Sequence, residues 1–136
     1  MNLEPLPEEA YIMMGDHVAH ALRSAQHHGF KRPIIACQFA KLLKIACGYE
    51  NTHAAASEMD LARFRGWAEE ERLPTELLEI ILNANTAREI VIASHFDGAL
   101  MSLAARKAVL AARSHAPHVE PTFLIADYSG HIVAVL

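Results

Sequence analysis

The sequence has no apolar run long enough to cross a membrane. Its strongest apolar stretch, Ile90–Ala93, is far shorter than the roughly 18 residues that a membrane helix needs. The first residues, Met1–Pro5, are acidic and lack the positively charged segment that begins a secretory signal. We therefore expect a cytoplasmic protein that does not contact a membrane.

Cysteine is also scarce, and the chain carries no net positive charge. Cys37 and Cys47 are the only two cysteines, and they form no CxxC pair. This spacing predicts reduced structural thiols, because a disulfide framework or a zinc knuckle needs more cysteines. Twelve Lys and Arg against sixteen Asp and Glu give a net charge of −4. This charge argues against a protein that binds nucleic acid through a basic surface.

The common short catalytic motifs are missing as well. The sequence contains no GxSxG, no GxGxxG loop and no P-loop. A serine hydrolase of the GxSxG type, a dinucleotide-binding loop of the usual kind and a nucleotide triphosphatase therefore have no support.

The composition that remains is that of one folded domain. The chain has 136 residues, of which 52% are hydrophobic, and its mean hydropathy is +0.13. A chain of this length and apolar content can bury one sizeable core and is unlike a disordered protein. We expect a single domain over residues 1–136.

The first half of the chain alternates between helical and extended patterns. Apolar side chains recur three and four residues apart from Tyr11 to Ala25, which predicts an amphipathic helix that ends near Gly29. The short apolar run Pro33–Cys37 is typical of a buried strand. Helical spacing returns over Ala40–Cys47.

The second half predicts further helices and then two strands. Ser57 and Asp60 resemble a capping pattern before a helix, and Pro74 and Thr75 begin another. Thr86 and Glu89 fit a capping box. The apolar run Ile90–Ile92 that follows would alone favour a strand, but the box favours a helix. The remaining predicted elements are a long helix from Asp97–Gly98 to about Ser114, strands at Thr122–Ala126 and His131–Leu136, and the turn Asp127–Gly130 between these strands.

This order of elements predicts an α/β fold. We expect a small, mostly parallel sheet with helices on both faces and a C-terminal strand pair. The sheet would consist of short strands only, so we also expect an uncovered edge or a vacancy that a homodimer or a missing upstream segment would fill.

Histidine is unusually frequent, with nine residues. On a helical wheel, His17, His20, His27 and His28 fall on the side of the first predicted helix that faces away from its apolar residues. His17 and His20 could hold a metal as a pair, but no cysteine or carboxylate is spaced to complete the shell. We expect surface histidines and no metal site.

Two polar segments could bind a ligand. Lys41 and Lys44 follow the first predicted strand and enter a helix, where free amides and the helix dipole favour anions. The same lysines could instead only solvate an amphipathic helix. Asn51, Thr52 and His53 supply an amide, a hydroxyl and an imidazole, which suit a ligand or proton transfer but also an ordinary turn.

Several of these motifs occur together in one known family. Gly15-Asp16, Lys41-Leu42, Gly48, Asn51-Thr52-His53 and Asn85-Thr86 stand in an order and spacing that resembles the C-terminal domain of the CbiD family. The Lys-Leu…Gly…Asn-Thr-His string is the specific part, and the resemblance extends to the closing segment Asp127–Val133.

The resemblance implies a role in anaerobic cobalamin biosynthesis. The CbiD family is the cobalt-precorrin-5B C(1)-methyltransferase, which transfers a methyl group from S-adenosylmethionine to C-1 of a cobalt-containing ring. By this resemblance, Lys41, Lys44, Asn51, Thr52 and His53 would bind substrate or cofactor, with Asn85 and Thr86 as further candidates. The ring carries carboxylates that lysines and a helix N-terminus could bind.

The resemblance also implies that the N-terminal domain of the family is absent from this sequence. A fragment or split subunit of the methyltransferase, inactive alone, is the leading hypothesis. The alternative is a non-catalytic module that uses the same fold for ligand binding or dimerisation. A histidine-rich metal-handling protein is a third, weaker hypothesis.

Overall fold

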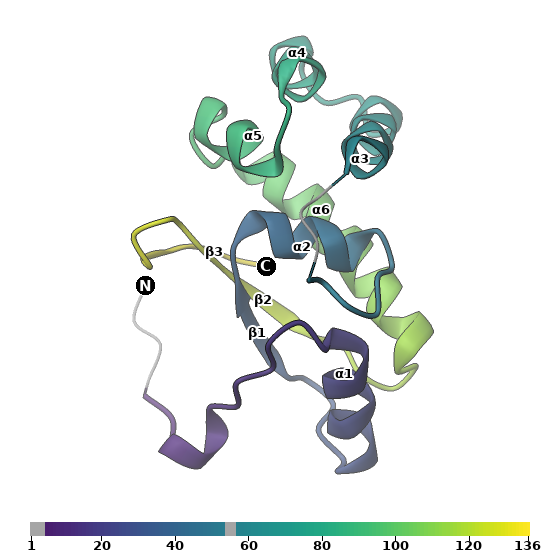
Figure 1. The fold of residues 1–136 in the computed structure, drawn as a ribbon, viewed down its shortest axis with the longest axis vertical. Helices are drawn as coiled ribbons and strands as arrows, with labels where there is room; N and C mark the ends of the chain where they lie inside the picture. The colour runs from purple at the N-terminus through teal and green to yellow at the C-terminus, as the bar shows by residue number, and fades with distance from the viewer. Residues whose placement is uncertain (1–4, 54–56) are drawn as a thin grey trace.

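The computed structural model describes residues 5–53 and 57–136 (Figure 1). The elements in chain order are the 3-10 helix η1 (Glu8–Ala10), α1 (Val18–His27), β1 (Ile34–Cys37), α2 (Phe39–Ala46), α3 (Glu58–Glu70), α4 (Thr75–Asn83), α5 (Ala87–Ala93), α6 (Gly98–His115), β2 (Thr122–Ala126) and β3 (Ile132–Val135). Within these ranges, no helix combines the length and the apolar character that a membrane crossing requires.

The strands form one sheet in the order β1-β2-β3. Strand β1 pairs parallel to β2, with Ile34 opposite Thr122, whereas β3 pairs antiparallel to β2, with Leu124 opposite Val135. The predicted α/β class and C-terminal strand pair are confirmed. One of the two pairings is parallel, so the expected "mostly parallel" sheet is a mixed one.

Helices cover only one face of this sheet in the described part of the chain. Ile35 and Cys37 of β1 are buried, whereas Ile34 and Ala36, which alternate with them along the strand, are exposed. Figure 1 shows α1, α2 and α6 on the same side of the strands. The expectation of helices on both faces is therefore wrong. Its physical reason is that β1 and β2 are joined by a single crossover, which places its helices on one side of the sheet.

The predicted first helix begins later than its apolar spacing suggested. Residues from Tyr11 to Met14 are not helical, and α1 starts at Val18 after a turn in which Gly15 has a φ of +58°. The amide of Thr52 donates to the carbonyl of Asp16 at 2.9 Å. This contact with a distant loop fixes the turn, and the apolar spacing alone did not reveal it.

Capping decides where several other helices begin. Ser57 and Asp60 form a complete capping box at the start of α3, as predicted. At α5, the Thr86 hydroxyl accepts from the Glu89 amide at 3.1 Å, but the Glu89 carboxylate accepts from the Asn85 amide at 2.8 Å. The Glu89 carboxylate therefore binds the amide one residue before the N-cap, instead of the Thr86 amide that a capping box would use. The run after it is helical, as the cap predicted.

The core lies where α2 packs on α6. One face of α6 consists of small residues, and Ala104, Ala108 and Ala112 are fully buried. Helices with small side chains at their contact can approach closely. On the other side of α2, the Phe39 and Phe64 rings meet edge to face, with centroids 5.6 Å apart, and this contact ties α3 to the core.

We predict that Ala108→Leu destabilises the protein. The added side chain has no space between α2 and α6, so the unfolding free energy should fall by about 1–3 kcal/mol. Leu110→Ala is the control, because Leu110 lies on the exposed face of the same helix. Chemical denaturation of both variants measures the difference, and an Ala108→Leu protein as stable as the control would contradict close packing here.

Candidate functional site

A group of polar residues gathers around the turn at Gly15 and Asp16. The Lys41 ammonium donates to the Gly15 carbonyl at 2.8 Å and lies 3.7 Å from the Asp16 carboxylate. The ring nitrogen Nδ1 of His53 lies 3.2 Å from the same carboxylate. Lys41 and His53 are both far from Asp16 in the sequence, yet both contact its carboxylate.

The loop after α2 completes this group. The side chain of Asn51 accepts a hydrogen bond from the His53 amide at 2.8 Å, which orders the loop. Thr52 is buried, and its amide and hydroxyl both face the Asp16 carbonyl. We call this group the Asp16 cluster; its members are Gly15, Asp16, Lys41, Asn51, Thr52 and His53. Four of the five residues predicted to bind a ligand therefore lie together.

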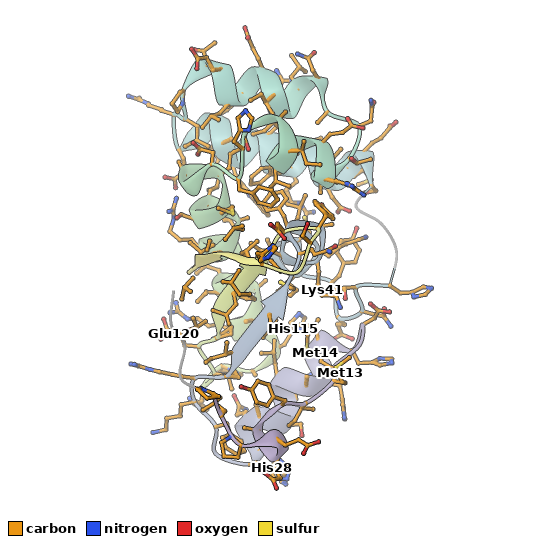
Figure 2. The ribbon with its side chains drawn as sticks, turned by 90° about the vertical axis from the view of Figure 1, so that its left-hand side faces the viewer. Met13, Met14, His28, Lys41, His115 and Glu120 are labelled. Atoms are coloured by element: carbon orange, nitrogen blue, oxygen red, sulfur yellow. The ribbon has the colours of Figure 1, made fainter. Side chains whose placement is uncertain are left out.

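The Asp16 cluster adjoins the N-terminus of α2. Strand β1 ends at Cys37, and α2 begins at Phe39 with Gln38 as an N-cap whose side chain makes no capping hydrogen bond. Lys41 lies in the first turn of this helix, and Figure 2 shows it above Met14. A helix N-terminus favours anions, because its first amides have no partner within the helix.

The Asp16 cluster presents both signs of charge. The hydrogen bond from His53 lowers the pKa of Asp16 below its ordinary value, and the charge of Lys41 acts in the same direction. Asp16 therefore stays ionised at neutral pH. The side chains of His53 and Lys41 are 87% and 29% exposed, so a ligand could reach them. This arrangement could bind a carboxylate and an ammonium group side by side.

Lys44 does not join the Asp16 cluster. Its ammonium lies 3.4 Å from the Asp60 carboxylate, and the two side chains are only 6% and 4% exposed. The ammonium also lies 4.0 Å from the centre of the Tyr49 ring, and the Tyr49 hydroxyl donates to Asp60 at 2.9 Å. The ion pair of Lys44 with Asp60 thus links α2 to the start of α3, and these contacts give Lys44 a structural role.

Asn85 and Thr86 lie in another part of the fold, at the start of α5. Thr86 borders an open hollow of about 860 Å³ between α4 and α5, lined also by Glu76, Ile80 and Arg88. Both residues take part in the cap of α5. The structure does not bring them to the Asp16 cluster.

Asp16 is the residue of this group that sequence reasoning did not select. The helix predicted from the apolar spacing between Tyr11 and Ala25 would include Asp16, whereas α1 begins only at Val18. The Gly-Asp pair itself was the available signal, since glycine followed by aspartate is typical of a turn.

The histidines around α1 and the two cysteines were the remaining candidates for a site. His17, His20, His27 and His28 are exposed, and His17 precedes α1 as its N-cap. Over residues 5–53 and 57–136, no three metal-binding side chains converge. Burial raises the pKa of Cys37 to about 12 and that of Cys47 to about 11. Both thiols therefore stay protonated at neutral pH and are poor nucleophiles.

The pair of Lys44 and Asp60 yields a pH prediction. Burial raises the pKa of Asp60, but hydrogen bonds from Ser57 and Tyr49 and the charge of Lys44 outweigh it, and the net pKa lies below 3.8. A carboxyl group whose pKa is lower in the folded than in the unfolded chain stabilises the fold at pH values above its unfolded pKa. This stabilisation is lost as the pH falls through the native pKa. Asp60→Asn should therefore cost about 3 kcal/mol at neutral pH, because it leaves Lys44 buried without a partner.

Urea denaturation between pH 7 and pH 2.5 tests this prediction. The difference between wild type and Asp60→Asn should shrink at acidic pH, where Asp60 itself becomes neutral. Glu58→Gln is the control in the same turn, since Glu58 is exposed, and it should change stability by less than about 0.5 kcal/mol. A difference that does not vary with pH would contradict the role of the Asp60 charge.

Known proteins resemble this chain over nearly its full length. A protein of Pelobacter propionicus named cobalt-precorrin-5B C(1)-methyltransferase is 65% identical over 133 residues, which are 98% of this chain and 34% of that protein. A Geobacter sulfurreducens protein of the same name is 44% identical over 96% of this chain and 36% of its own length. One of Pseudomonas entomophila is 34% identical over 94% and 36%.

The chain therefore spans about a third of the length of the curated relatives it matches. No solved structure matches it. Residues 51–135 match the family described as CbiD, C-terminal domain. This range includes Asn51, Thr52 and His53 of the Asp16 cluster and the helices α3 to α6 with β2 and β3. The chain belongs to the CbiD C-terminal domain family.

Proposed function

We propose that this chain is the C-terminal part of a cobalt-precorrin-5B C(1)-methyltransferase of cobalamin biosynthesis and is not active alone. The observation that carries the proposal is the 65% identity to the Pelobacter propionicus relative over 98% of the chain. The reaction takes place in the cytoplasm, where unpaired thiols such as Cys37 and Cys47 stay reduced.

Within this enzyme, the Asp16 cluster binds the amino acid end of the methyl donor, S-adenosylmethionine. That end carries one ammonium and one carboxylate. The ionised Asp16 suits the ammonium, while Lys41 and the N-terminus of α2 suit the carboxylate. The donor supplies the methyl group, and the cluster's residues bind and orient it.

The precorrin ring is the other candidate ligand for this cluster, and the charge of Asp16 argues against it. The side chains of the ring end in carboxylates, which Lys41 would attract and Asp16 would repel. A purely anionic ligand would gain from a cluster without an aspartate. Because Asp16 lies between Lys41 and His53, the mixed cluster fits a ligand with both charges better.

A chimera of the complete Pelobacter propionicus enzyme, with its matched third replaced by this chain, tests the proposal. We predict that the chimera methylates cobalt-precorrin-5B. Lys41→Ala in the chimera should raise the KM for S-adenosylmethionine about tenfold or more, because a charged hydrogen-bond partner is lost. The KM for the precorrin should change much less.

Lys31→Ala is the control, because Lys31 is an exposed lysine outside the Asp16 cluster. It should leave both KM values unchanged. An increase confined to the precorrin KM would assign the cluster to the methyl acceptor instead. A chimera that folds but transfers no methyl group would refute the proposed function itself.

A further inference from the structure

The outer face of the sheet, away from α2 and α6, is mostly apolar across the three strands. We use the term outer face for Ile34, Ala36, Thr122, Leu124, Ile132 and Val135, which the strand register places side by side. Ile34 on β1 is 53% and Val135 on β3 39% exposed, and Leu124 on the central strand is 9% exposed, whereas Ile35 and Phe123 on the opposite face are buried. Figure 2 shows β1 and β2 from this side, with no helix in front of their central part.

An outer face of this composition is unusual for a sheet that borders water. Antiparallel sheets with one solvated face normally alternate apolar and polar residues, and strands that are apolar on both sides are typical of sheets covered on both faces. Five of the six residues of the outer face are apolar, Thr122 being the exception, and Ala36, Leu124 and Val135 form a continuous row across the strands. Such a patch indicates a contact surface.

The edge of the sheet points to the same conclusion. Strand β1 pairs only with β2 among the described residues, so the backbone groups on its other side have no strand partner. Unpaired edges next to an apolar face favour association with another chain segment. The outer face and this edge would be covered together by one neighbouring layer of structure.

The length of the relatives indicates what forms this layer. The matched region makes up only 34% to 36% of the three relatives described above. The other two thirds of each relative lie outside the matched region, and the outer face offers that part of the polypeptide exposed apolar side chains on β1 and β3. We propose that the outer face is the docking surface for the remaining part of the longer methyltransferase polypeptide.

Thiol labelling tests this proposal in the proteins as they exist. Ile34→Cys and Val135→Cys are made in this chain, and cysteine is placed at the aligned positions of the complete Pelobacter propionicus relative. Labelling with a water-soluble maleimide, measured against each parent protein, should be at least tenfold slower in the complete relative. The native Cys37 and Cys47 contribute little background, since burial raises the pKa of both thiols.

Leu82→Cys is the matched control, because Leu82 on α4 is also 53% exposed. It should be labelled at similar rates in the chain and in the relative. Circular dichroism melting checks that each variant folds, and the two sites on separate strands ensure that one failed variant does not decide the result. Equal labelling of the outer face in both proteins would overturn the proposal, as would equal protection of Leu82→Cys.

A second copy of this chain is the competing occupant, and the same experiment distinguishes it. The labelling of Ile34→Cys in the chain alone is repeated from low to high micromolar concentration. Rates that stay constant support a surface reserved for the rest of the polypeptide. Protection that grows with concentration, together with a dimer in light scattering, would overturn the proposal in favour of self-association.

Discussion

The contact between α2 and α6 holds this molecule together. The buried alanines of α6 allow α2 to lie close against it, and α2 also contacts the helices α3 and α5 and the strand β2. The sheet is thereby attached to one side of α2 and the helices α3 to α5 to the other (Figure 1). A change that separates α2 from α6 would disturb both parts at once.

The two lysines of α2 show how this position shapes the polar chemistry. They are three residues apart, yet Lys41 reaches the turn at Gly15 and Asp16, whereas Lys44 is buried against Asp60. The first is accessible and lies beside a helix N-terminus, which suits ligand binding. The second is shielded from water, and its attraction to Asp60 joins α2 to the start of α3. Similar residues in one helix thus have different surroundings and different consequences.

Much of the fold could be predicted, because the signals for it are local. The Ser57–Asp60 box and the Thr86 hydroxyl set helix starts from residues three apart, and the short apolar runs gave β1 and β2 within one residue. The extent of the first helix could not be predicted, because its apolar spacing continued through a turn that a distant loop stabilises. The covering of the sheet was predicted wrongly, although the predicted order of elements already joined the first two strands by a single crossover, whose helices lie on one side of the sheet.

The site was predictable in part, for the same reason. The sequence by itself selected Lys41, Lys44, Asn51, Thr52 and His53 as candidates, with Asn85 and Thr86 as further ones, and its family resemblance pointed to the methyltransferase. Only the tertiary structure decided that Asp16 lies between Lys41 and His53, that Lys44 is directed into the interior, and that the outer face of the sheet is open. Caps and apolar periods act between neighbours along the chain, whereas ion pairs and surface exposure depend on segments that meet only when the chain folds.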